Sequence, residues 1–258
     1  MALPGSNFGF KSLKFVEELG AMSAFTLDIA RTVVAPPFRF AALLRELYKL
    51  GVLSLIIILV SGLTVGMVLG LQGYHTLARF GAKQSLGAMV GLSLIRELGP
   101  VVTALLVAGR AGSATAAEIG TMVATEQLDG LRMLSIDPIS LVIKPKALAM
   151  LVVTPFLTAM FIACGLYGGY LVGVGLMGGD PGSYVASLKS NVDFQNDIVC
   201  SMLKSVVFGF LLGLIATYRG YTSAPTAEGV SAATTSSVVI SSVTVLLADY
   251  VITALWGT

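Results

Sequence analysis

The sequence predicts an all-α integral membrane protein, and three observations point to this fold class. Charged residues make up 12% of the 258 positions, against about 25% in a typical soluble domain. Apolar residues make up 55%, and the mean hydropathy is +0.88. Several charge-free runs are long enough to cross a bilayer, which takes about 20 apolar residues. So much apolar surface argues against a soluble enzyme, a nucleic-acid binder and a secreted disulfide scaffold.

We expect five membrane-spanning helices. The first contains no charged residue, the second contains Arg96 and Glu97, the fourth contains Lys204, and the fifth contains Asp249. The expected bounds are about 50–71, 85–109, 147–177, 198–218 and 233–255. Residues 50–258 are therefore predicted to form one transmembrane domain.

The distribution of Lys and Arg predicts the orientation of these helices. If the N-terminus is cytoplasmic, the cytoplasmic segments 1–49, 110–146 and 219–232 carry eleven of these residues, and the opposite side carries three. Cytoplasmic loops of membrane proteins are enriched in Lys and Arg. We therefore expect a cytoplasmic N-terminus and a periplasmic C-terminus.

The segment 1–49 is too polar to cross the membrane. Apolar residues recur in it every three or four positions, with charged residues between them, at Phe10, Leu13, Val16, Leu19, Met22, Phe25, Ile29 and Val33. This spacing predicts an amphipathic helix that ends before Pro36 and lies in the cytoplasmic membrane interface. A helix that packs on a partner protein is the alternative.

Two spans carry glycines at four-residue spacing. The first span contains Gly62, Gly66 and Gly70, and the third contains Gly165, Gly169 and Gly173. Stripes of small residues let helix backbones approach closely in a membrane. They predict helix packing, either within one chain or at the interface of a homodimer.

The adjacent charges Arg96 and Glu97 are unexpected because twelve uncharged residues flank them on each side. A charge at the centre of a membrane helix costs about 2.5–3.5 kcal/mol on insertion scales, so it should face protein or a wet cavity. Pro100 follows closely and can break the helix. Together with Lys204 and Asp249, these residues predict either a structural ion-pair network or a polar patch for a substrate headgroup.

The segment between the second and third spans predicts a short amphipathic helix at about 118–134. Ile119, Met122, Leu128 and Leu131 alternate there with charged residues, and Pro138 follows. Such a helix on the cytoplasmic side is a natural docking element for a soluble partner.

Several chemistries have no support in the sequence. It contains no GxxxxGK[ST], HExxH or GxSxG motif, one His and two Cys, and both Cys lie in apolar runs. We therefore predict no catalytic residue, no metal site and no nucleotide bound through a P-loop of this chain.

The longest distinctive stretch is LIRELGPVVTALLVAGRAGSATAAEIGTMVATEQLDGLRMLSIDP, residues 94–138. It resembles the signature region of the MlaE/YrbE permease family, as do residues 51–74, 203–209 and 220–239 and the layout of five spans. These permeases are membrane subunits of ABC transporters that move phospholipids between the bacterial inner and outer membranes and maintain outer-membrane lipid asymmetry.

The resemblance implies a homodimer in the inner membrane of a Gram-negative bacterium, with three further kinds of partner. A cytoplasmic MlaF-like ABC ATPase would bind ATP and Mg²⁺, so that this chain needs no cofactor. A hexameric MlaD-like MCE protein would lie on the periplasmic side, and an MlaB-like STAS-domain protein would bind the ATPase. The ATPase would dock on the 118–134 helix, at Glu118, Met122, Glu126, Asp129, Leu131 and Arg132.

A phospholipid carrier needs a wide apolar wall and a few polar groups. We expect a cavity between two protomers, open to the periplasm, with a wall made by Leu69, Leu71, Tyr74, Leu77 and Phe80. Arg96, Glu97, Lys204 and Asp249 would contact the headgroup or brace the moving helices. An ion-coupled secondary transporter and a passive anchor for soluble subunits are the alternatives, although the spans show no inverted repeat.

Overall fold

The computed structural model describes residues 17, 20–32 and 40–256. Within these ranges every regular element is a helix. Five helical segments are long and apolar enough to cross a membrane, which confirms the predicted all-α class and number of spans. They run over Phe40–Arg79, Lys83–Ala124, Ile139–Leu176, Phe194–Tyr221 and Ala227–Trp256.

The first segment consists of α2 (Phe40–Leu50), a short 3₁₀ turn (Val52–Ser54) and α3 (Leu55–Arg79). The third consists of a wide π-helical turn (Ile139–Ile143), α8 (Lys144–Tyr170) and a second wide turn (Leu171–Leu176). After α9 (Pro181–Asn191) and the turn Phe194–Ile198, the fourth continues as α10 (Val199–Tyr221), and the fifth is α11 (Ala227–Trp256).

The second segment is longer than predicted and is not broken at Pro100. It runs through α4 (Leu86–Ser93), a π-helical turn (Leu94–Leu98), α5 (Gly99–Val107), another π-helical turn (Ala108–Gly112) and α6 (Ser113–Ala124). The helix tolerates Pro100 because the preceding turn is widened, so that the Gly99 amide donates to the Leu94 carbonyl.

A charged residue also lies inside this segment at the predicted end of the span. The Arg110 guanidinium donates to the Lys49 carbonyl oxygen at 3.0 Å and to the Ser54 hydroxyl at 2.6 Å. Because partners within the chain satisfy this cation, the helix does not need to end at residue 109. The second helical segment therefore continues beyond the predicted bound at residue 109, to Ala124.

The predicted helix at 118–134 is also divided in the structure. It comprises the end of α6, a turn and α7 (Gln127–Met133), and Glu126 in the turn has a left-handed backbone with φ of 57°. A continuous helix was therefore the wrong expectation.

The glycine stripes pack α3 against α8 within one chain. A Cβ added at Gly66 would overlap the backbone of Gly165, and Gly62 and Gly70 similarly contact the backbones of Phe161 and Gly169. The last glycine of the stripe, Gly173, contacts Leu86 of α4 instead. Contacts within the chain therefore occupy both stripes.

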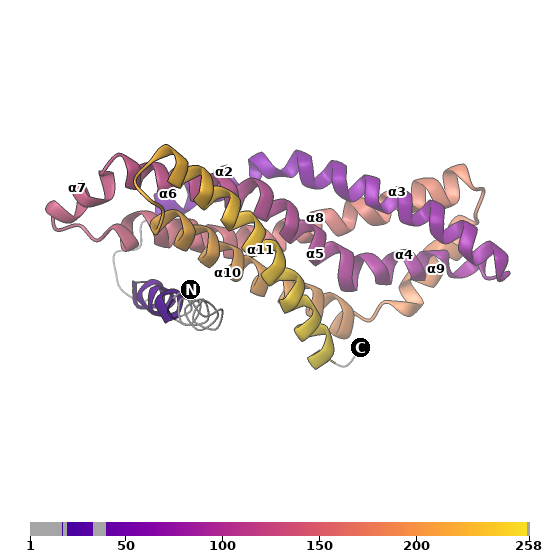
Figure 1. Cartoon of the computed structure of the whole chain (residues 1–258). Coiled ribbons are helices and arrows are strands. Elements are labelled where there is room, and N and C mark those ends of the chain that lie inside the picture. The colour runs from indigo at the N-terminus through magenta and orange to yellow at the C-terminus, as the bar shows by residue number, and fades with distance from the viewer. Residues whose placement is uncertain (1–16, 18–19, 33–39, 257–258) are drawn as a thin grey trace, which may run out of the picture.

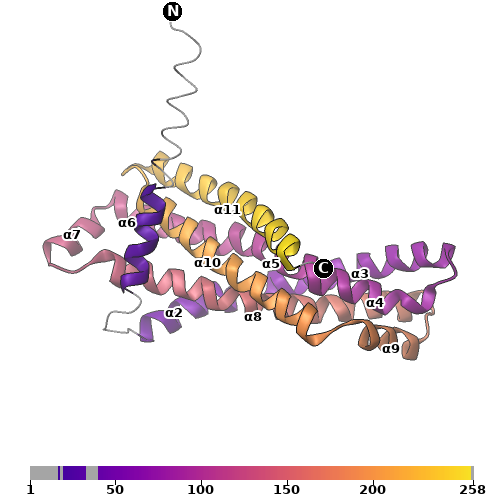
Figure 2. The same ribbon diagram turned by 90° about the horizontal axis from the view of Figure 1, so that it is seen from below.

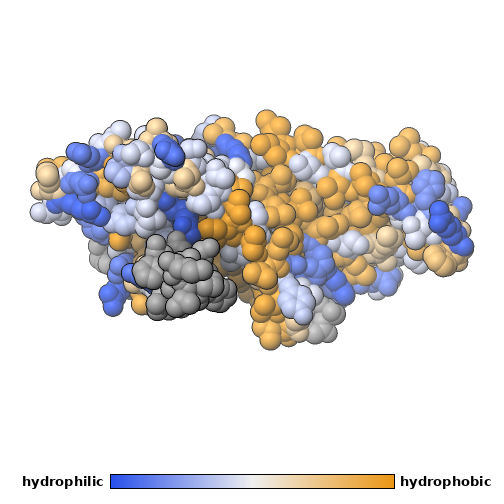
Figure 3. Space-filling view, in the orientation of Figure 1, coloured by the Kyte–Doolittle hydropathy of each residue, from blue (hydrophilic) through white to orange (hydrophobic). Residues whose placement is uncertain are grey.

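The molecule is elongated, with α7 at one end and α4 and α9 at the other, as two perpendicular views show (Figures 1 and 2). We call these the α7 end and the α9 end. On the face drawn in Figure 3, hydrophilic residues gather at the two ends and a hydrophobic band lies between them. This pattern fits a protein that spans a bilayer with both ends in water.

Residues 20–32 form a helix near the α7 end. Its side chains Phe25 and Ile29 are buried, and the Phe25 ring lies 5.5 Å from the rings of Tyr218 and Tyr221 in α10. Met22 packs on the same cluster. The other apolar residues of the predicted amphipathic helix, Phe10, Leu13, Val16, Leu19 and Val33, lie outside the described residues.

Candidate functional site

The four charged residues that the sequence placed inside spans meet in one group. Lys204 of α10 is almost fully buried, and its ammonium lies 3.1 Å from Glu97 Oε1 and 3.0 Å from Asp249 Oδ1. It also donates to the Thr253 hydroxyl at 2.8 Å. The acids come from the second and fifth spans, so Lys204 links three helices.

Lys204 has one further partner, the Arg96 carbonyl oxygen at 2.9 Å. In a regular α-helix the amide of residue 100 would donate to this oxygen, but Pro100 has no amide hydrogen. A buried backbone carbonyl left without a donor is costly. Lys204 therefore supplies a side-chain donor to a carbonyl whose regular α-helical partner Pro100 removes, while it also neutralises the two acids.

Arg96 pairs with an acid that the sequence analysis missed. Its Nε atom lies 2.7 Å from Asp197 Oδ1, and the buried Asp197 also accepts from the Asp193 amide at 2.8 Å. Asp197 lies one residue before the predicted fourth span and seven residues before Lys204. That spacing places two residues on the same helix face, and it is the signal that could have found Asp197. We call Arg96, Glu97, Asp197, Lys204 and Asp249 the span cluster.

The span cluster is open on one side. The side chains of Arg96 and Glu97 are 40% and 44% exposed in the isolated chain, whereas those of Lys204 and Asp197 are almost fully buried. The buried charges hold the helices together, and the two exposed charges face the surface of a span.

A second group of charges lies near the α7 end. The buried ammonium of Lys146 lies 2.6 Å from Glu118 Oε2 and 3.2 Å from Glu46 Oε2. Lys49 lies 3.5 Å from Glu118 and 3.6 Å from Glu46. These four residues, which we call the elbow cluster, join α2, α6 and the start of α8. Glu118, predicted as a docking residue, is thus tied into the chain.

The remaining predicted docking residues divide into two kinds. Met122 and Leu131 are half-buried and pack on the cluster that contains Phe25. Glu126, Asp129 and Arg132 are exposed, and Arg132 pairs with Asp129 at 2.7 Å. The exposed face at the α7 end therefore combines these charged side chains with the exposed apolar residues Met133 and Leu134.

The predicted lipid wall also divides. Leu69, Tyr74 and Leu77 are half-buried and pack against the hydrophobic core. Leu71 and Phe80 are exposed. The five residues therefore do not form one continuous exposed face of the single chain.

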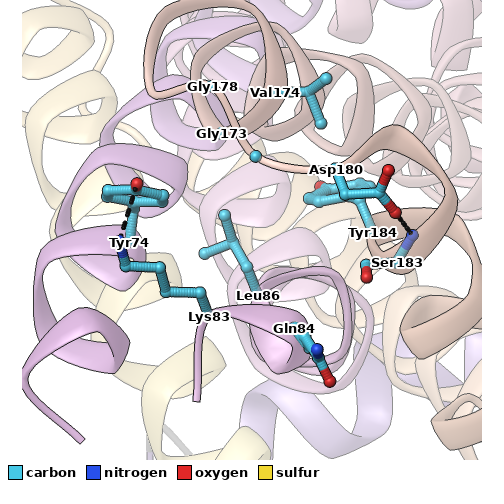
Figure 4. A pocket seen from close by; sticks show the side chains of 11 residues that line it. Tyr74, Lys83, Gln84, Leu86, Gly173, Val174, Gly178, Asp180, Ser183 and Tyr184 are labelled. Carbon is cyan, nitrogen blue, oxygen red and sulfur yellow. Dashed lines mark hydrogen bonds between the residues drawn. The ribbon is translucent and has the colours of Figure 1, made fainter. Parts of the chain in front are cut away.

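A cavity of about 270 Å³ opens at the α9 end, and of the predicted wall residues only Tyr74 lines it. Figure 4 shows Tyr74 and Lys83 on one side of it and Asp180, Ser183 and Tyr184 on the other. Burial raises the pKa of Tyr184 to about 12, so its hydroxyl stays neutral and donates to the Leu166 carbonyl oxygen at 3.3 Å. The sequence analysis did not find this cavity because its walls come from distant segments.

Among residues 20–32 and 40–256, no group of three or more His, Cys, Asp and Glu could hold a metal ion. Cys164 and Cys200 are free thiols.

Five apolar helices joined by buried ion pairs define a multi-pass α-helical membrane protein. The family model described as "Permease MlaE" matches residues 43–255. The chain therefore belongs to the MlaE permease family, the membrane subunits of ABC transporters, as the sequence resemblance predicted.

Curated relatives agree with this family over most of their length. The chain is 51% identical to the "Intermembrane phospholipid transport system permease protein MlaE" of Haemophilus influenzae, over 84% of this chain and 83% of the relative. It is 38% identical to a "Probable ABC transporter permease protein" of Rickettsia bellii, over 97% and 96%. It is 36% identical to a "Probable ABC transporter permease protein" of Synechocystis, over 80% and 78%.

Proposed function

We propose that this permease moves phospholipids between the inner and outer membranes of a Gram-negative bacterium and so maintains outer-membrane lipid asymmetry. The name of the Haemophilus influenzae relative supports this substrate. A partner ATPase supplies the energy by binding ATP and Mg²⁺, and this chain binds no cofactor.

The chain lies in the inner membrane with its α7 end in the cytoplasm and its α9 end in the periplasm. Eleven Lys and Arg residues in the segments expected to be cytoplasmic, against three in those expected to be periplasmic, support this orientation. The helix at residues 20–32 then lies at the cytoplasmic interface, and the C-terminus is periplasmic.

The observation that carries the proposed mechanism is the exposure of Arg96 and Glu97 on the surface of a span. A charge that faced hydrocarbon there would cost about 2.5–3.5 kcal/mol on insertion scales. A second copy of the chain removes this cost by enclosing both side chains in a wet cavity. The active unit is therefore a homodimer whose central cavity opens to the periplasm, and α11, the least buried of the five spans, is available for this contact.

Phospholipid acyl chains lie against the apolar wall in this cavity. The exposed residues Leu71 and Phe80 contact lipid directly, and Leu69, Tyr74 and Leu77 back them from the core. Each buried methylene contributes about 0.8 kcal/mol, so an apolar wall gives affinity with little dependence on the headgroup.

The cytoplasmic ATPase docks at the α7 end on the exposed residues Glu126, Asp129 and Arg132, in the manner of a coupling helix. The elbow cluster ties this end to α2 and α8, so a push on α7 reaches the spans. An MCE protein binds the periplasmic side, and a STAS-domain protein binds the ATPase.

Reconstitution of the complete complex into donor vesicles tests this function. Leu71→Arg should reduce ATP-dependent phospholipid transfer to acceptor vesicles at least tenfold because the cation would enter the apolar wall. Gln72→Arg, at the neighbouring exposed position, is the matched control and should transfer normally. Co-purification of the partner subunits verifies assembly.

Unchanged transfer by the assembled Leu71→Arg complex would refute the lipid wall. A passive anchor predicts that result, and an ion-coupled carrier predicts transfer by this chain without an ATPase.

A further inference from the structure

The cavity at the α9 end has walls from three parts of the chain. Tyr74 comes from α3, Lys83 and Gln84 from the turn before α4, and Asp180 and Ser183 from the start of α9 (Figure 4). The proposed lipid wall uses only Tyr74 of these residues. The polar groups of this cavity therefore have no role in the mechanism above.

One wall of the cavity carries a cation with free donor capacity. Lys83 Nζ lies 3.2 Å from the Tyr74 hydroxyl and 5.0 Å from the centre of the Tyr74 ring. Neither contact supplies a negative charge, and among the described residues no carboxylate lies within ion-pair distance of Lys83. An ammonium has three donors, so at least one remains for an anionic ligand.

The opposite wall carries an anion. Asp180 caps α9, and its Oδ2 atom accepts from the Ser183 amide at 2.6 Å. This carboxylate occupies the N-terminus of α9 and would repel a second anion there. Its other oxygen has no hydrogen bond to the described residues. A ligand that satisfies both walls must therefore carry a negative and a positive group.

The size of the cavity restricts this ligand further. Its volume of about 270 Å³ is below the range of about 300–1,000 Å³ usual for drug-sized ligands. It therefore fits a headgroup and not a whole phospholipid. Leu176, two positions before the lining residue Gly178, is 76% exposed and offers apolar surface for acyl chains.

We propose that this cavity binds the zwitterionic headgroup of a phospholipid, with the phosphodiester at Lys83 and the ammonium at Asp180. The inference rests on the proposed function for the periplasmic position of the α9 end and for the substrate class. It adds a second lipid site, outside the central cavity, that selects for the headgroup.

Photocrosslinking in the complete complex tests the site. A photoreactive p-benzoylphenylalanine at Gln84, which lines the cavity, should label ³²P-phosphatidylethanolamine in nanodiscs. Lys83→Gln should reduce this labelling at least fivefold because the phosphodiester loses its cation. Lys189→Gln removes a charge from exposed α9 surface outside the cavity and should leave the labelling unchanged.

The Asp180→Asn variant tests the contact with the ammonium of the headgroup separately from the contact with the phosphodiester. Asn caps a helix about as well as Asp, so α9 is preserved while the charge is lost. Labelling by phosphatidylethanolamine should fall at least threefold, whereas labelling by phosphatidylglycerol, which has no ammonium, should not fall. An equal fall for both lipids, or an unchanged Lys83→Gln variant, would overturn the proposal.

Two further arms separate this inference from its alternatives. Soluble glycerophosphoethanolamine carries the same headgroup, so an excess should reduce lipid labelling at Gln84. Labelling that stays unchanged in this excess would show that the cavity does not recognise the headgroup and would overturn the proposal. A second photoprobe at Leu71 reports on the central cavity. Labelling at Leu71 without labelling at Gln84 refutes only the headgroup site, and labelling at neither position refutes the proposed function as well.

Discussion

The span cluster and the elbow cluster have the same core and different surroundings. Each contains an almost fully buried lysine between two acids: Lys204, 1% exposed, with Glu97 and Asp249, and Lys146, 3% exposed, with Glu46 and Glu118. In the elbow cluster Lys49 is a second cation close to both acids. Lys204 has no such substitute, because Arg96 is paired with Asp197.

This difference determines how the stability of the protein should respond when one cation is removed from each cluster. In the elbow cluster two cations share two acids near the α7 end, so one can be lost without leaving an acid unpaired. In the span cluster the single ammonium also satisfies the Arg96 carbonyl. Removal of Lys204 should therefore strongly destabilise the protein, whereas removal of one lysine of the elbow cluster should lower its stability less.

The largest effect is expected for Lys204→Met. The variant leaves Glu97 and Asp249 without their cation and removes the side-chain donor to the Arg96 carbonyl, and breaking a buried pair in this way costs about 3–5 kcal/mol. We expect most of the protein to be lost on purification in detergent, measured by size-exclusion yield. Lys189→Met is the control, and a normal yield of Lys204→Met would contradict a structural role for the cluster.

The elbow cluster should respond less to the equivalent change. In Lys146→Met the acids Glu46 and Glu118 keep Lys49 as a neighbour, and the Met side chain fills most of the space of the Lys stem. Two hydrogen bonds to carboxylates are lost while Lys49 still neutralises the acids, so we expect a loss of about 1–3 kcal/mol. Thermal unfolding in detergent measures it, and a loss as large as that of Lys204→Met would remove the distinction between the clusters.

The sequence was more informative about the span cluster than about the elbow cluster. Arg96, Glu97, Lys204 and Asp249 stood out because long uncharged runs surround them. Glu46, Lys49 and Lys146 lie in segments where other charges are common, and nothing local indicates that Lys146 is buried. Its partners are 28 and 100 residues away in the chain, a separation at which one sequence gives no pairing.

The fold was likewise only partly predictable from the sequence, because contacts between distant segments decide some of its features. The five spans were predictable from charge-free runs, but their ends were not, because Arg110 finds partners at Lys49 and Ser54 and the helix continues past it. Pro100 was expected to be able to break the helix near Arg96, but the helix continues there through a widened turn. The widened turn and the contact of its Arg96 carbonyl with Lys204 involve a helix 108 residues away in the chain, which the local sequence does not indicate.

The smallest effect is expected for Lys49→Ala, which removes the outer cation of the elbow cluster. Lys49 and Glu118 are both partly exposed and lie 3.5 Å apart, and such pairs contribute about 0–1 kcal/mol. The free energy of unfolding should fall by less than about 1 kcal/mol, and high salt should shrink the difference because it screens exposed charges. A loss that is larger than that of Lys146→Met, or independent of salt, would show that Lys49 and not Lys146 holds the cluster together.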